Sequence, residues 1–171
     1  MNIVIVGTAY PLRGGIAHYI ALLYRALSER HMVSIVTFSR QYPALLFPGK
    51  SQQEHESEGA AVPSERLIDS INPLSWIVAA KAIAAKKPGL VIFKYWLPFF
   101  GPCFGFIARA VKRRTNAKVL FICDNVIPHE RRPGDLVFTR YAFRTVDFFV
   151  VQSKAVEEEL KAFWPSARFK L

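Results

Sequence analysis

The chain has 171 residues, of which 51% are hydrophobic, so it is long enough for one domain with a proper core and too short for two ordinary domains. This composition excludes an intrinsically disordered tail. Lysine and arginine number 23 against 13 aspartate and glutamate residues, and the net charge of +10 predicts an anionic partner: nucleic acid, acidic phospholipid or a phosphorylated substrate.

The first half of the chain alternates between apolar strands and an amphipathic helix. Its expected elements are a strand at 2–6, a helix with the apolar stripe Ile16, Ile20, Leu23 and Leu27, a strand at 33–38, and a helix at 73–87 that is stopped by Pro88-Gly89. Residues 39–66 are polar and include SQQEHESEG at 51–59, so we expect a mobile loop there.

The second half continues the alternation. Its expected elements are a strand at 90–96, a proline-bounded turn, a helix at about 101–114, a strand at 118–123, a helix at about 133–145, a strand at 147–152 and a helix capped by Ser153. Phe169-Lys170-Leu171 has the pattern of a further strand, which predicts that the chain is the first domain of a longer protein. Near-continuous apolar strands followed by helices predict a parallel sheet covered on both faces, with ligands beyond the carboxyl ends of the strands.

Cysteine usage and hydropathy bear on the cellular compartment. The two cysteines, Cys103 and Cys123, form no CxxC pair, which suits a reducing compartment and two buried thiols. The start MNIVIVGTAYP has no basic segment before its apolar residues, so no signal peptide is expected. The most apolar window, 93–111, is interrupted by charged residues and prolines, which argues against a spanning helix. We therefore expect a cytoplasmic protein.

Three segments carry groups suited to chemistry, and the first is TAYPLRGGIAHY at 8–19. Gly14 and Gly15 lie where a loop meets a helix, so the backbone could approach a phosphate held by helix N–H groups. The positive charge of Arg13 beside them favours the interpretation that this loop binds an anion. The segment matches neither G-x-G-x-x-G nor the P-loop pattern, so an ordinary tight loop is the alternative.

The second segment is KYWLPFFGPCFGFIARAVKRR at 94–114, which combines aromatic and basic residues. Such a segment can dock on an anionic membrane surface or interleave with nucleic acid. The alternative is an amphipathic helix packed on the sheet with a solvated basic face. Nucleic acid is not expected, because the chain has no RNP, KH or helix-turn-helix pattern.

The third segment, ICDNVIPHERRPG at 122–134, follows an apolar strand directly. Asp124 and His129 could each act as a general base, and Asn125 could orient a hydroxyl group. A metal site is not expected, because HERR lacks the second histidine of H-E-x-x-H. No G-x-S-x-G elbow supports a hydrolase, and a hydrogen-bonded structural turn is the remaining alternative.

Together, VGTAYPLRGGIAHYIALLYRAL (6–27), CDNVIPHE (123–130) and VVQSKAVEEEL (150–160) resemble the N-terminal domain of family-four (group 1) glycosyltransferases with the GT-B fold. The resemblance implies an α/β fold, a Rossmann-like three-layer sandwich with a mainly parallel sheet. It implies that residues 1–171 form a single acceptor-binding domain and that a C-terminal donor-binding domain is absent from this chain.

The resemblance also implies an activity. The whole protein would be a retaining hexosyltransferase that moves a sugar from a nucleotide-sugar to a glycan or lipid-linked acceptor, with no tightly bound cofactor and no metal. Its partners would be the donor, the acceptor and, peripherally, an anionic membrane at the inner face, without nucleic acid. The fragment alone is expected to be inactive. The alternatives are a non-catalytic membrane-surface or protein-binding module and, with less support, a nucleotide-binding sensor domain.

The resemblance assigns site residues as follows. Catalytic roles are expected for Asp124 and His129, and substrate contacts for Arg13, Gly14, Gly15, Asn125, Glu130, Tyr95 and Trp96. Many relatives carry a histidine where this chain has Asp124, so the choice between Asp124 and His129 as the group nearest the transferred sugar stays open, with Asp124 favoured. Replacing Asp124 by alanine is expected to abolish transfer and leave folding nearly intact.

Overall fold

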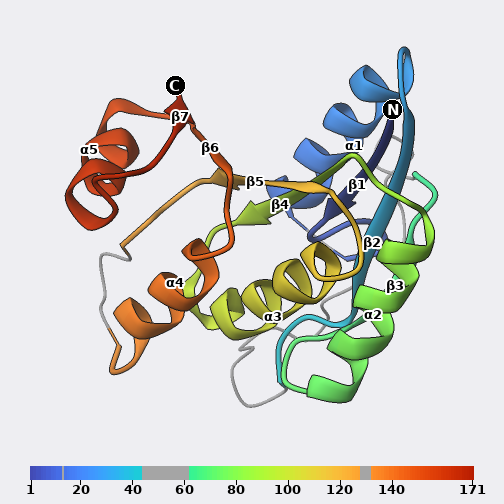
Figure 1. Ribbon diagram of the computed structural model, residues 1–171, viewed down its shortest axis with the longest axis horizontal. Helices are drawn as coiled ribbons and strands as arrows, with labels where there is room; N and C mark the ends of the chain where they lie inside the picture. Colours follow the sequence, from blue (N-terminus) through green and yellow to red (C-terminus); the bar gives the residue numbers. More distant parts are fainter. Residues whose placement is uncertain (13, 44–61, 128–131) are drawn as a thin grey trace.

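A seven-stranded sheet lies between two layers of helices in the computed structural model, which describes residues 1–12, 14–43, 62–127 and 132–171 (Figure 1). The strands are β1 (Asn2–Val6), β2 (Met32–Arg40), β3 (Glu65–Asp69), β4 (Leu90–Tyr95), β5 (Lys118–Cys123), β6 (Phe148–Val151) and β7 (Phe169–Lys170). The helices are α1 (Gly15–Ser28), α2 (Pro73–Ala85), α3 (Gly101–Lys112), α4 (Asp135–Phe143) and α5 (Lys154–Phe163), with a 3-10 turn η2 (Pro98–Phe100) before α3. The strand order is β3-β2-β1-β4-β5-β6-β7, and each of these pairings is parallel. The Rossmann-like α/β fold expected from the sequence is confirmed.

The two faces of the sheet are covered by different helices. Ile3 and Ile5 of β1 face α1, whereas Val4 and Val6 face the core formed with α2, α3, α4 and α5. Figure 1 shows α1 on the opposite side of the sheet from α2, α3 and α4. Because the central strands are covered on both faces, they need apolar residues at successive positions, which explains the unbroken runs in the sequence.

The segment 94–114 contributes its rings to the core. The Trp96 and Phe100 rings pack at an interplanar angle of 43° with centroids 4.4 Å apart, and the Phe93 ring lies 5.3 Å from that of Phe104 and 5.1 Å from that of Phe121. Helix α3 packs on the sheet as the packed-helix alternative expects, whereas membrane docking by the basic residues of this segment stays a prediction. Most of its rings are buried, but Phe99 and Phe106 are half-buried.

Helices α3 and α4 approach closely through two glycines of α3. A Cβ at Gly101 would lie 2.4 Å from the Phe138 carbonyl oxygen, and a Cβ at Gly105 would lie 2.7 Å from the Tyr141 ring. These distances are shorter than any side chain tolerates, so glycine is required at both positions. The pair sits four residues apart on one face of α3, which fixes how α4 lies on it.

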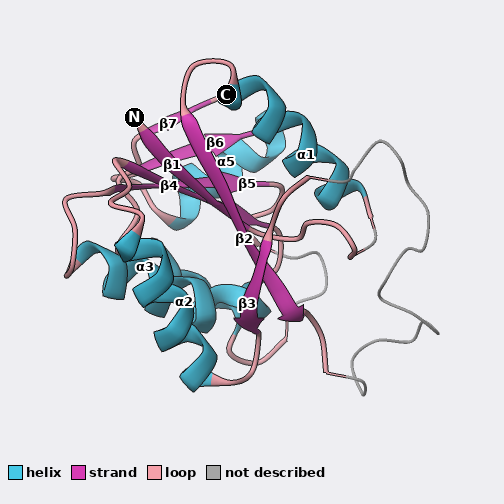
Figure 2. Cartoon of the chain, turned by 90° about the vertical axis from the view of Figure 1, so that its right-hand side faces the viewer, coloured by secondary structure: helices cyan, strands magenta, loops and turns pink. Residues whose placement is uncertain are grey.

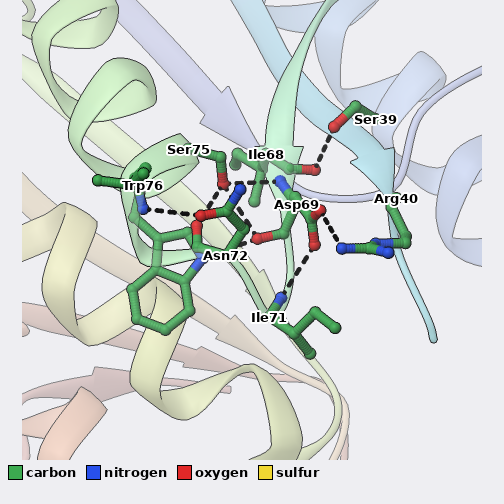
Figure 3. Close-up of polar contacts among 9 residues, drawn as sticks. Ser39, Arg40, Ile68, Asp69, Ile71, Asn72, Ser75 and Trp76 are labelled. Carbon is green, nitrogen blue, oxygen red and sulfur yellow. Dashed lines mark hydrogen bonds and ion pairs between the residues drawn. The ribbon is translucent and has the colours of Figure 1, made fainter.

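A hydrogen-bond network centred on Asp69 holds the start of α2 to the end of β3 (Figure 3). The Asp69 carbonyl oxygen accepts from the Ser75 hydroxyl at 3.1 Å and from the Trp76 indole at 2.7 Å. Its carboxylate pairs with Arg40 of β2. Asn72 caps the helix by accepting the N–H two residues further on at 3.0 Å. These contacts anchor α2 to the edge of the sheet.

The sequence prediction missed one strand and misplaced several ends. Residues 39–66 were expected to form a loop, but β2 continues to Arg40 and β3 begins at Glu65, beside β2 at the sheet edge (Figure 2). Three of the five residues of β3 are charged, and its pairing with β2 is irregular, so neither periodicity nor apolarity marks it. Residues 44–61, including the 51–59 segment, lie outside the described residues.

The remaining predictions concern the thiols and membrane spans. Cys103 and Cys123 are both buried and unpaired, as expected, and burial raises the pKa of each thiol. Throughout the described ranges, no helix has the length and apolarity that crossing a bilayer requires.

Candidate functional site

Polar groups from several elements meet at the carboxyl ends of β1, β4, β5 and β6. The chain leaves β1 for β2 on one side, while β4 lies on the other side of β1, so the direction of winding changes between β1 and β4. Open parallel sheets bind their ligands at such a switch point. The N-terminal part of α1 and the segments after β5 and β6 lie at this edge.

A buried lysine lies at the centre of this edge. Lys94, near the end of β4, is 2% exposed, and its ammonium donates to the Asp124 carboxylate and, at 3.0 Å, to Gln152 Oε1. The same nitrogen lies 4.0 Å from the ring centroid of Tyr19 in α1. Because a buried charge needs partners, the lysine holds the Asp124 and Gln152 side chains in place.

Asp124 connects this buried cluster with the solvent. Its side chain is 28% exposed, so part of the carboxylate is available to a ligand hydroxyl while the other part is paired with Lys94. The segment that follows is also fixed: Glu159 of α5 accepts the N–H groups of Val126 at 3.2 Å and Ile127 at 3.3 Å. Asn125, between the two anchored parts, is half-buried.

Two hydroxyl groups complete this edge. Burial, followed by the negative charge of Asp124, raises the pKa of the Tyr19 phenol, while a hydrogen bond with Gln152 acts in the opposite direction. Tyr19 is therefore a neutral donor at ordinary pH. The Thr8 hydroxyl, just after β1, is 1% exposed and has no hydrogen-bond partner among the described residues. A buried hydroxyl without a partner is uncommon, and this one lies at the switch point, where a ligand would offer it a hydrogen-bond partner.

The N-terminus of α1 lies one turn from Tyr19. Gly14 precedes the helix with φ 117°, a conformation that favours glycine, and the first turn carries neither a capping side chain nor an acidic residue. A Cβ at Gly14 or Gly15 would meet no atom of the described residues within 4 Å. Uncapped N–H groups and the positive end of the helix dipole make this position suited to an anion.

Tyr95 and Trp96 lie elsewhere. The Tyr95 hydroxyl is 2.8 Å from Thr139 Oγ1 in the core, and burial raises the pKa of this phenol. Trp96 is 8% exposed and donates its indole N–H to the Tyr42 hydroxyl at 3.1 Å. Successive residues of a strand face opposite sides, so Tyr95 points away from Lys94 and its partners. The structure places both rings in the core and does not bring them to the Asp124 edge.

The structure thus brings Gly14, Gly15, Asp124 and Asn125 to one edge. The other expected site residues, Arg13, His129 and Glu130, lie outside the described residues. Sequence reasoning did not assign Lys94, Gln152, Tyr19 or Thr8 to the site. The sequence carries a signal for two of these four residues. Lys94 is a lysine inside the apolar run VIFKYW, and Gln152 is a glutamine directly after FFVV.

Metal binding finds no support in the described ranges, where no three histidine, cysteine, aspartate or glutamate side chains group as ligands. The site chemistry available there is an ion-paired carboxylate, neutral hydroxyl donors and a helix N-terminus. Such a set is suited to hydrogen bonds with ligand hydroxyl groups and to an anionic group at the backbone N–H groups.

Solved structures share this fold at low sequence identity. Sucrose-phosphate synthase from Thermosynechococcus elongatus superposes with a TM-score of 0.57 at 16% identity, over 100% of this chain and 87% of that one. UDP-N-acetylglucosamine 2-epimerase from Rickettsia bellii gives 0.65 at 12% identity, over 99% of this chain and 44% of that one. An α-glucosyltransferase in complex with UDP and DNA gives 0.59 at 13% identity, over 99% and 40%. The chain thus spans less than half the length of the last two proteins.

Sequence comparison gives the family. No curated protein matches the chain significantly. The glycosyl transferase 4-like domain matches residues 14–169, which is nearly the whole chain and includes the α1 N-terminus, Lys94, Asp124 and Gln152. The chain therefore belongs to the glycosyl transferase 4-like domain family, with the GT-B type of Rossmann-like fold.

Proposed function

We propose that this chain is the acceptor-binding domain of a retaining hexosyltransferase, which transfers a sugar from a nucleotide-sugar to a glycan or lipid-linked acceptor. The observation that carries the proposal is the Lys94–Asp124 pair at the same sheet edge as the uncapped N-terminus of α1. Two similar structures support a nucleotide-sugar donor, since one is named for UDP-N-acetylglucosamine and the other is a complex with UDP.

The geometry suits sugar transfer in the following way. As the bond between the sugar C1 and the diphosphate oxygen breaks, positive charge develops on the sugar and negative charge on the diphosphate. The N–H groups at Gly14 and Gly15 would stabilise the negative charge from across the cleft. Asp124 would accept a hydrogen bond from a sugar or acceptor hydroxyl, in an orientation fixed by Lys94. His129 remains the second candidate for this contact.

The proposed transferase would be longer than these 171 residues. A C-terminal domain would bind the nucleotide, and the 171-residue chain alone would be inactive. Sugar transfer to a lipid-linked acceptor would take place at the cytoplasmic face of a membrane, which the protein would contact peripherally. The competing proposal, a non-catalytic binding module on the same scaffold, predicts no transfer from any donor.

The experiment uses the full-length protein in a donor screen with UDP-, GDP- and ADP-hexoses, measuring nucleotide release and sugar incorporation. Gly15→Val tests the anion position, because a Cβ there meets none of the described residues within 4 Å and the change should leave the fold intact. Asp124→Asn tests the carboxylate. Asp147→Asn is the matched control, since Asp147 pairs with Lys112 at 2.9 Å near the opposite, amino edge of the sheet.

The expected result is a fall in kcat of about 100-fold or more for Gly15→Val and Asp124→Asn, as for the loss of one transition-state contact. Asp147→Asn should stay within about twofold of the unsubstituted enzyme. Unchanged turnover in Gly15→Val would refute the placement of the donor diphosphate at the Gly14 and Gly15 N–H groups. Absence of transfer from every donor by the unsubstituted protein would favour the non-catalytic module.

A further inference from the structure

The outer surface of α2, α3 and α4 exposes aliphatic side chains that no described element covers. On α2, Leu74 is 71% exposed and Val78 is 55% exposed, and on α4, Val137 is 68% exposed. Ile77 and Leu136 extend the two groups, with exposed fractions of 37% and 45%. A single exposed leucine is ordinary, but aliphatic groups on the two helices that flank α3 mark a surface that contacts something apolar.

Arginines line the hollow between these helices. A cavity of about 450 Å³ lies over α3 between α2 and α4, and its wall includes Arg109, Arg113 and Arg114 beside Ile77 and Tyr141. The Arg109 guanidinium stacks on the Tyr141 ring at 4.3 Å, which holds it in place and leaves its N–H groups free to donate.

A second hollow, of about 250 Å³, continues this surface along α4. Arg140 and Arg144 lie in its wall with Leu136 and Val137, and Tyr141 borders both hollows. The two hollows and the aliphatic groups therefore form one continuous surface, here called the α2–α4 face. In Figure 1 its three helices lie on the same side of the sheet.

The charge on the α2–α4 face is almost entirely positive. Helices α2 and α3 contain no acidic residue, and the single one in α4, Asp135, is 9% exposed and accepts the Arg132 N–H at 2.8 Å. Among the described residues, no carboxylate pairs with the five arginines of the face. Lys112, at the end of α3, differs because Asp147 neutralises it.

We infer that the α2–α4 face docks on a bilayer that contains anionic phospholipids. Aliphatic side chains at the level of the headgroups and arginines bonded to lipid phosphates are the two contributions that such binding combines. The charge complementarity selects an anionic surface, and the exposed aliphatic groups select a bilayer over a purely polar polyanion. The bearing of this docking on catalysis rests on the proposed function, because it would bring a lipid-linked acceptor to the enzyme.

The direction of the helices gives the docked orientation. Each of the three helices follows a parallel strand and runs back along the sheet, so their first turns lie at the carboxyl edge. Leu74, Leu136 and Val137 therefore lie at the edge that carries Asp124, and Arg113 and Arg144 lie towards the opposite end. A bilayer along this face would place its lipid headgroups beside the candidate site.

The test is co-sedimentation of the chain with vesicles of phosphatidylcholine alone or with 30% phosphatidylglycerol, which measures binding and not sugar transfer. Two variants remove the two contributions: Leu74→Ser/Val78→Ser, and Arg113→Gln/Arg114→Gln/Arg144→Gln. Matched controls on other surfaces are Leu22→Ser on α1 and Lys154→Gln/Lys170→Gln on α5 and β7. Each replaced side chain is exposed, so folding should be retained, and circular dichroism of each variant checks this.

The expected result is binding to the anionic vesicles that weakens with added salt, and little binding to neutral ones. The arginine variant should lower the partition coefficient about 100-fold and the aliphatic variant about tenfold, with the controls within about twofold. No binding to anionic vesicles at low salt, or equal losses in variants and controls, would overturn the inference. Vesicle binding by this chain, together with no sugar transfer from any donor by the full-length protein, would support the docking face and refute the proposed function alone.

Discussion

Replacing Asp124 by asparagine should destabilise the domain strongly, because the Lys94 ammonium would lose its counter-charge while staying buried. Lys94 is 2% exposed, and Gln152 would be its remaining hydrogen-bond acceptor. Breaking a buried ion pair by removing one partner costs about 3 to 5 kcal/mol of unfolding free energy. In a chain of this size, that cost corresponds to a fall in the unfolding midpoint of about 6 to 20 °C.

The reciprocal change should cost less. In Lys94→Met the Asp124 side chain, 28% exposed, keeps access to water, so we expect a loss of about 1 to 2 kcal/mol. The double variant Asp124→Asn/Lys94→Met removes both charges of the pair. Its loss of unfolding free energy should differ from the sum of the two single losses by a coupling energy of about 1 to 3 kcal/mol. The expectation that Asp124→Ala leaves folding nearly intact is revised, since it did not include the buried lysine.

Thermal and urea unfolding, followed by circular dichroism, measure these differences. The Lys112–Asp147 pair is the matched control, because its side chains are 34% and 20% exposed and Asp147→Asn should cost about 1 kcal/mol or less. Equal midpoints for Asp124→Asn and Asp147→Asn would refute the argument, as would strict additivity in the double variant.

Gly105→Ala should lower the unfolding free energy by about 1 to 3 kcal/mol, since its Cβ would lie 2.7 Å from a ring of α4. Gly15→Ala, whose Cβ meets no described residue within 4 Å, is the control in the same urea titration, and equal stability of the two variants would contradict the close helix packing. The pH dependence gives a further prediction: burial raises the pKa of Asp147, but the Val119 N–H and Lys112 outweigh it, so the net pKa is lowered. This carboxylate contributes stability above pH about 4 that is lost as the pH falls through its folded pKa. Asp147→Asn should flatten that part of the stability profile, and an identical profile would exclude the contribution.

The central strands could be predicted because burial on both faces leaves an unbroken apolar signal. NIVIV and KVLFIC carry it, and the structure places β1 and β5 there. An edge strand needs one apolar face at most, and ERLID satisfies this with Ile68 as its fully buried residue, so β3 gave no comparable signal. Helix ends were less predictable, since caps depend on local backbone geometry such as φ 94° at Gly134 before α4.

The location of the candidate site could be predicted from the sequence, but the full set of residues that form it could not. A polar cluster after an apolar strand locates the carboxyl edge of a parallel sheet, and Asp124 lies there. The sequence does not reveal which distant polar residue lies beside Asp124, because Lys94 and Gln152 reach it only through the strand order. Strand alternation also placed Tyr95 on the core side, a distinction that the apolar run LVIFKYW obscures.

The strand order has a consequence for how the domain folds. β4 is the middle strand of the sheet, and Leu90 at its start pairs with Ile3 of β1, far away along the chain. During synthesis, the first 40 residues can form β1, α1 and β2, but the sheet gains its middle only after β4 has emerged. Such non-local pairing slows folding. The Lys94 cluster requires α1, β4, β5 and β6 together, so it assembles late, and a spectroscopic probe near Tyr19 would report completion of the fold.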